Sequence, residues 1–149
     1  MRLAIEKPDQ TSVESYGIHL PFGLIGLPKL TRFEVAPIEG SWPFLSMRAT
    51  TGDEFDFIAI EPFGIVPGYD LELSDSDAEA LQISTGRDAL VLNIVSIHSF
   101  QPQYVTVNLV GPVVVNRMTL VGKQVLAANA DRYSTHYVLI DERGRAHAA

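Results

Sequence analysis

The sequence contains no cysteine in its 149 residues. This absence excludes disulfide bonds, a thiolate nucleophile and zinc sites with cysteine ligands. Long apolar runs are also missing: the segment 89–95 is interrupted by Asn93, and a membrane-spanning helix needs about 20 apolar residues. Charged Arg2, Glu6 and Lys7 argue against a secretory signal at the amino terminus. We therefore expect a cytoplasmic protein that does not enter a membrane.

Positive charge is scarce as well. The chain has 11 Lys and Arg residues against 18 Asp and Glu residues, so its formal net charge is −7 at pH 7. Nucleic-acid phosphates are bound mainly through Lys and Arg, so direct binding of nucleic acid is not expected. A basic protein partner would complement this charge. The simpler alternative is that the charge keeps a small domain soluble.

Apolar residues, in contrast, are abundant enough for a folded core. The content of 46% hydrophobic and 19% charged residues is typical of a folded domain and not of a disordered chain. A compact chain of this length buries roughly 70% of the surface that its unfolded form exposes. No internal repeat or linker interrupts the sequence. We expect a single domain over residues 1–149, with its core at about 16–140 and a polar tail at 141–149.

Apolar and polar residues alternate with a period of two in several short segments, which predicts strands. In 55–60 and 90–95 both sets of alternate positions are apolar at the centre. This pattern predicts strands covered on both faces, or a closed barrel with an additional layer over part of it. Turn-forming Gly and Pro separate the segments at roughly ten-residue spacing, as in all-β folds. The predicted strands are 16–20, 32–38, 43–48, 54–61, 69–73, 90–98, 105–110, 112–118, 123–127 and 136–140.

One segment has the features of a helix. Ser74 can cap its first turn together with Asp77, and acidic residues in that turn favour the helix dipole. We expect this helix to end by Gly86. The predicted fold class is therefore all-β: a single-domain, β-barrel-like fold of short, mostly antiparallel strands with one short helix.

The sequence offers little catalytic chemistry. Its four histidines have no pair at a metal-binding spacing, and the acidic run that begins at Asp75 has Ala80 and Gly86 where a calcium loop needs Gly and Glu. No phosphate loop or serine elbow is complete. We therefore predict no catalytic residue, no cofactor and no metal site. The alternative is a small barrel that binds an apolar ligand, or acts as a hydrolase or isomerase through His98 or His136 with a nearby carboxylate.

Apolar side chains in two glycine- and proline-containing loops are the more informative feature. Such residues either fold back into the core or form a recognition surface, and the sequence leaves both alternatives open. The residues are Phe22, Leu24, Ile25 and Leu27 in the first loop and Phe63, Ile65 and Val66 in the second.

The stretch TVNLVGPVVVN, residues 106–116, is dense in valine and yet contains Gly111 and Pro112. Proline has no backbone N–H, so an unbroken central strand would lose a ladder hydrogen bond there. We predict two strand segments joined at a Gly111–Pro112 corner. Asn108 and Asn116 would bracket this corner and satisfy loose backbone groups, because a buried amide needs hydrogen-bond partners.

The order of these motifs resembles that of the FliW family of flagellar assembly factors. The resemblance covers about residues 16–140 and differs from the usual family sequence at Ile25, Gly26 and Leu27, where a proline-glycine-phenylalanine sequence is common. The elements that carry it are FGLIGLP, RFEVAPI, Pro43 with Phe44, the F-x-x-x-x-P-F element from Phe57 to Phe63, TVNLVGPVVVN, and Gln124.

The resemblance implies a β-barrel-like cytoplasmic protein without catalytic activity. It also implies two partners, flagellin and the RNA-binding regulator CsrA, whose repression of flagellin translation the family relieves. In this partner switch, exported flagellin would release the protein to sequester CsrA, and the free protein is expected to be a monomer. The candidate protein-binding residues are Phe63, Tyr69, Asn108, Asn116 and Gln124, for each of which a role in packing or turn formation is the alternative.

Overall fold

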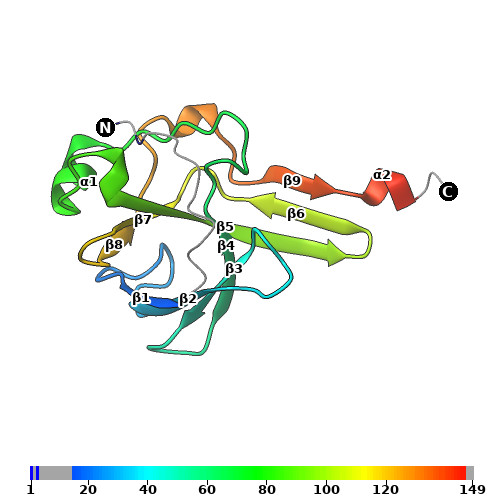
Figure 1. The fold of residues 1–149 in the computed structure, drawn as a ribbon, viewed down its shortest axis with the longest axis horizontal. Coiled ribbons are helices and arrows are strands. Elements are labelled where there is room, and N and C mark those ends of the chain that lie inside the picture. The colour runs from blue at the N-terminus through cyan, green and yellow to red at the C-terminus, as the bar shows by residue number, and fades with distance from the viewer. Residues whose placement is uncertain (2, 4–14, 147–149) are drawn as a thin grey trace.

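The structure is a computed structural model that describes residues 1, 3 and 15–146. Within these residues nine strands form a curled sheet in which every strand ladder is antiparallel (Figure 1). The all-β, mostly antiparallel fold is therefore confirmed. The strands are β1 (Tyr16–His19), β2 (Arg32–Pro37), β3 (Leu45–Ala49), β4 (Asp56–Ile60), β5 (Ala89–Phe100), β6 (Gln103–Val107), β7 (Val113–Asn116), β8 (Gly122–Gln124) and β9 (Tyr137–Asp141).

The long strand β5 connects two parts of the sheet. Its residues 89–92 pair with β7, whereas 95–100 pair with β6. The chain that leaves β6 therefore has to turn before it reaches the other end of β5. Gly111 and Pro112 lie in this turn, directly before β7, which confirms the predicted corner.

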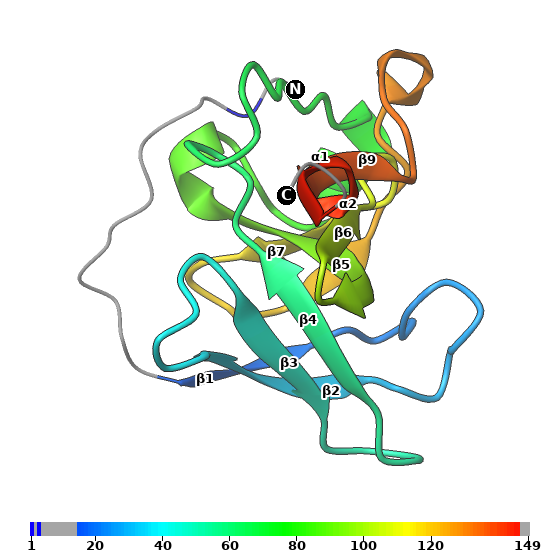
Figure 2. The same cartoon turned by 90° about the vertical axis from the view of Figure 1, so that its right-hand side faces the viewer.

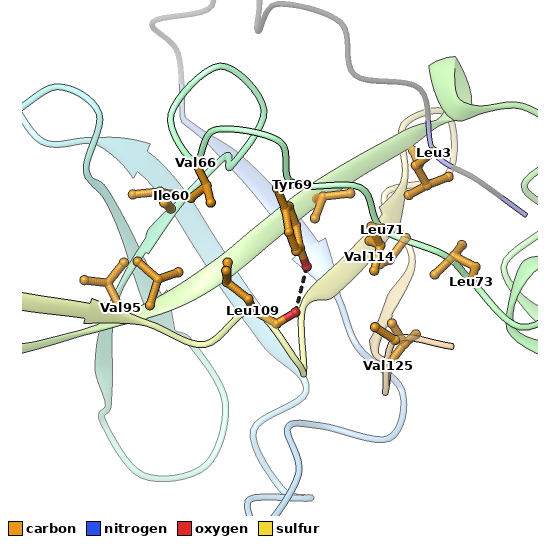
Figure 3. Packing of buried hydrophobic residues seen from close by; sticks show 14 of the residues in the cluster. Leu3, Ile60, Val66, Tyr69, Leu71, Leu73, Val95, Leu109, Val114 and Val125 are labelled. Atoms are coloured by element: carbon orange, nitrogen blue, oxygen red, sulfur yellow. Dashed lines mark hydrogen bonds between the residues drawn. The ribbon is translucent and has the colours of Figure 1, made fainter. Parts of the chain in front are cut away.

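Two hydrophobic clusters lie on opposite sides of the central strands. Val113 and Val115 of β7 belong to the cluster enclosed by the curled part of the sheet, while Val114 between them belongs to the other cluster. β5 divides in the same way, with Leu92 in the first cluster and Val91 in the second. The segments that are apolar on both faces are thus covered on both faces, as their alternation predicted. The second cluster is shown in Figure 3.

The predicted helix is present as α1 (Asp75–Ala80). Its Ser74 Oγ accepts a hydrogen bond of 3.1 Å from the Asp77 backbone N–H, which is the expected cap. The helix is followed by Gln82, whose φ of 57° lies in the left-handed region and ends the helical path before Gly86. Two short 3-10 turns, Gly86–Asp88 and Ala130–Arg132, were not predicted.

Nine of the ten predicted strand segments overlap the observed strands, but the prediction of a strand at 69–73 was wrong. The backbone there is bonded partly to backbone groups of residues 1, 3 and 128 and partly to side chains. The Leu3 N–H donates to the Leu71 carbonyl at 3.1 Å, and the Leu73 N–H donates to the Met1 carbonyl at 2.8 Å. Asn129 Oδ1 accepts from the Glu72 N–H at 3.1 Å, and its Nδ2 donates to the Asp70 carbonyl at 2.6 Å. The Tyr133 hydroxyl accepts from the Asp70 N–H at 2.8 Å. These side chains satisfy groups that a neighbouring strand would otherwise bind.

The segment predicted as a polar tail, 141–149, is described as far as residue 146. Asp141 ends β9 and is followed by the short helix α2 (Arg143–Ala146), while residues 147–149 lie outside the described residues. The Arg143 guanidinium forms two hydrogen bonds of 3.0 Å with the Asp141 carboxylate and lies 3.7 Å from the centre of the Tyr104 ring. Residues 95–100 of β5 form, with β6, β9 and α2, an arm that extends from the curled sheet (Figure 1) and is viewed end-on in Figure 2.

Candidate functional site

The corner at Gly111 and Pro112 is held by Asn108. Its Oδ1 accepts hydrogen bonds of 3.0 Å from the backbone N–H groups of Val110 and Gly111. An asparagine that binds backbone groups two and three residues further on stabilises a turn. Asn108 thus fixes the chain reversal between β6 and β7, the backbone role that the sequence predicts for it.

Gln124, the last residue of β8, joins this corner to the first glycine loop. Its Nε2 donates to the Gly111 carbonyl at 2.9 Å, and its Oε1 accepts from the Ile25 N–H at 2.8 Å. The two contacts use one donor and one acceptor of the same amide, so neither glutamate nor an apolar residue can replace them. The loop, β8 and the corner are therefore coupled through one side chain.

Tyr69, in the segment after β4, is bonded to the same corner and has only 1% of its surface exposed. Its hydroxyl donates to the Leu109 carbonyl at 2.9 Å (Figure 3), and Asn93 Nδ2 lies 3.4 Å from the same oxygen. The Phe63 ring, which is half-buried, stacks on Tyr69 with their centroids 6.0 Å apart. Burial raises the pKa of Tyr69 to about 12, so its hydroxyl keeps its proton and remains a donor at neutral pH.

Asn93 was not predicted to be part of the site, although its position inside the apolar run of β5 is a visible signal. Its side chain is fully buried, and its Nδ2 also donates to the Asn108 carbonyl at 2.9 Å. Its Oδ1 has no hydrogen-bond partner among the described residues. Asn93 therefore links β5 to Asn108, which precedes the corner, and to Tyr69, whose hydroxyl is bonded to Leu109. Asn129, which supports residues 70–72, was missed as well.

Asn116 lies apart from the other four candidate residues. Its Oδ1 accepts from the N–H groups of Met118 and Thr119 at 2.8 and 3.2 Å. Its Nδ2 donates to the carbonyls of Leu81 and Gln82, which follow α1, at 2.9 and 3.2 Å. Asn116 thus satisfies backbone groups, as predicted, but it joins the end of β7 to the end of α1 and not to the corner.

The constellation that a histidine enzyme would require is not assembled in the described part of the chain. His98 Nε2 lies 2.8 Å from the Thr106 hydroxyl and its ring packs on Tyr104, while His136 Nδ1 lies 2.8 Å from the Thr135 hydroxyl. Neither imidazole contacts a carboxylate there. The described residues also contain no group of three metal-ligating side chains, and none of their helices has the length and hydropathy needed to cross a bilayer.

Both alternatives for the apolar loop residues are realised. Leu24 and Val66 are buried in the two clusters, whereas Phe22 and Ile25 of the first loop are exposed. The backbone conformation of this loop depends on Gly23, which has φ of +66° and whose Cβ would lie 2.6 Å from the Leu27 carbonyl oxygen. The first loop therefore presents two apolar side chains on a closely packed backbone.

The curled antiparallel sheet matches that of a solved structure. The chain is similar to the crystal structure of the flagellar assembly factor FliW, with a TM-score of 0.75 and 28% sequence identity over 85% of this chain and 87% of the other. The fold thus places the chain in the class of flagellar assembly factors.

Sequence comparison identifies the family. The family model described as FliW protein matches residues 5–139. The flagellar assembly factor FliW of Clostridium novyi (strain NT) is 37% identical over 80% of this chain and 82% of its own length. That of Clostridium botulinum (strain Langeland / NCTC 10281 / Type F) is 33% identical over 84% and 86%. The chain belongs to the FliW family, as its motifs indicated.

Proposed function

We propose that this protein is a cytoplasmic, non-enzymatic regulator of flagellar assembly that binds flagellin and the translational repressor CsrA in turn. When flagellin is exported, the released protein captures CsrA and relieves the repression of flagellin translation. Membership of a family of flagellar assembly factors is the observation that carries this proposal. Two partners of one regulator are linked at equilibrium, so each lowers the apparent affinity of the other by the same factor.

The distribution of charge supports a basic, RNA-binding partner. Glu72 and Glu79 are exposed on and next to α1, and Asp53 and Glu54 are exposed in the turn between β3 and β4. A net charge of −7 steers a partner rich in Lys and Arg towards the chain and disfavours nucleic acid itself. The chain would therefore bind CsrA in competition with RNA. It would not bind RNA itself.

Retention of both partners on the immobilised chain tests the proposal. The immobilised protein is first freed of any bound partner. Flagellin and CsrA from the host organism are then each passed over it. We expect both to be retained, and we expect excess flagellin to elute bound CsrA. Retention of neither partner would refute the proposed function.

A further inference from the structure

Two segments far apart in the sequence, residues 19–29 and 117–126, meet where the end strands β1 and β8 of the curled sheet come together. His19 bridges to Val121, and its N–H donates to the Leu120 carbonyl at 2.9 Å. Six residues further along the first segment, the Ile25 N–H donates to Gln124. We call this pair of segments the seam.

The seam exposes four large apolar side chains. Phe22 is 74% exposed, Ile25 69%, Leu126 64% and Met118 87%. All four belong to segments whose backbone is fixed by hydrogen bonds. An ordered backbone therefore presents these side chains. Large apolar side chains that a rigid backbone holds in water are candidates for a protein-interaction surface.

Charge along the seam differs from charge on the rest of the chain. None of the 18 Asp and Glu residues lies in 16–33 or in 89–130, although the net charge is −7. Lys29 is exposed in the same loop as Ile25 and forms no ion pair within the described residues, while Lys123 is bound to Asp77 at 2.8 Å. The seam is thus apolar with an available cation, on a molecule that otherwise repels acidic partners.

We infer that the seam is the docking surface for an amphipathic segment of flagellin that carries carboxylates beside its apolar face. The inference rests on the proposed function and adds to it the surface and the chemistry of the bound segment. Apolar residues of a helix would cover Phe22, Ile25 and Leu126, and a carboxylate on its flank would pair with Lys29. The acidic faces elsewhere remain available to attract a basic partner.

Titration calorimetry with full-length host flagellin tests this surface. Phe22→Ser with Leu126→Ser removes two exposed side chains of the seam, and Phe100→Ser with Val138→Ser is a matched control on the arm, where Phe100 is 80% exposed. We expect the seam variant to bind flagellin at least tenfold more weakly and the arm variant to bind within twofold of the wild type. Lys29→Glu should also weaken binding, and high salt should reduce its difference from the wild type.

The outcomes separate the docking surface from the function. Wild-type binding that survives the seam substitutions, or that is lost only with the arm substitutions, would overturn the seam as the docking surface and leave the proposed function intact. Failure of the wild-type chain to bind flagellin at all would overturn the proposed function and the docking surface together. Equal circular dichroism spectra of the variants show that neither substitution unfolds the chain.

Discussion

The Tyr69 hydroxyl donates a hydrogen bond of 2.9 Å to the Leu109 carbonyl, two residues before the Gly111–Pro112 corner. This bond connects the segment after β4 to the turn between β6 and β7, across 40 residues of sequence. The sequence suggests Tyr69 as a contact for a partner. Its burial means that its first role in the folded chain is to hold the corner in place.

Tyr69→Phe should destabilise the protein without changing the volume of the core. The substitution leaves the buried Leu109 carbonyl without its donor, which costs about 1–3 kcal/mol in the free energy of unfolding. Denaturant titration measures this loss. Tyr137→Phe is the control, because the half-buried Tyr137 hydroxyl forms no hydrogen bond within the described residues. Equal stability of the two variants would contradict the role of the Tyr69 hydroxyl.

Stability should fall steeply at alkaline pH. Burial, together with the nearby Tyr133, raises the pKa of Tyr69 from 10.0 to about 12, while its bond with Asn93 acts in the opposite direction. A raised folded-state pKa means that the native state holds the proton more tightly than the unfolded state. The stabilisation is therefore complete below pH 10 and is lost between about pH 10 and 12. Tyr69→Phe should show a shallower decline in denaturant midpoints over this range, and an unchanged slope would contradict the assignment.

Two amide substitutions should have opposite outcomes at the corner. Asn108 acts there through its Oδ1 acceptor, so Asn108→Asp should retain stability, whereas Asn108→Ala should lose about 1–3 kcal/mol. Gln124 uses both its donor and its acceptor, so Gln124→Glu should be destabilising because it places a carboxylate against the Gly111 carbonyl. Thermal and denaturant unfolding of the three variants measures the order. A stable Gln124→Glu variant would refute the coupling of loop and corner.

Gly122→Ala should be costly, because β8 approaches β7 closely at this position. A Cβ there would lie 2.6 Å from the Val114 carbonyl oxygen and 2.7 Å from Val115 Cγ2. Overpacking of this kind costs about 1–3 kcal/mol, and more when backbone has to move. Gly17→Ala in β1 is the matched control, since its Cβ would meet only the Phe33 carbonyl oxygen at 3.9 Å. Unfolding midpoints that fall equally in both variants would contradict the close approach.

Charge reversal near α1 should weaken the capture of CsrA. Glu72→Lys with Glu79→Lys raises the net charge by four, and Glu39→Lys with Glu54→Lys makes the same change elsewhere on the surface. If the acidic segment around α1 steers the basic partner, the first variant should bind CsrA about tenfold more weakly at low salt. The difference should shrink as salt is added. Equal affinities of the two variants at low salt would show that only the total charge matters.

Local signals in the sequence predicted the fold well where neighbouring residues decide the structure. The Ser74 cap, the glycine turns and the Gly111–Pro112 break all act within a few residues, and each was found as expected. The alternation of apolar residues likewise identified strands with two covered faces. These features follow from short-range backbone geometry and burial, which one sequence is sufficient to show.

Contacts between distant residues could not be predicted. Residues 69–73 have the alternation of a strand, yet their backbone is bonded to the side chains of Asn129 and Tyr133, 57 and more residues away, and to the backbone of Met1 and Leu3. Gln124 reaches Ile25 across 99 residues, and no pattern in the sequence specifies that pair. The five candidate residues remain predictions as partner contacts. Four of them, all except Phe63, form hydrogen bonds that hold backbone groups in place.

A competition titration measures whether flagellin and CsrA are alternative partners of this chain, as proposed. The chain is titrated with CsrA in the calorimeter, first alone and then with saturating host flagellin. We expect tight binding in the first titration and an affinity at least tenfold weaker in the second, with the reciprocal titration giving the same factor. Equal CsrA affinity with and without bound flagellin would contradict the partner switch.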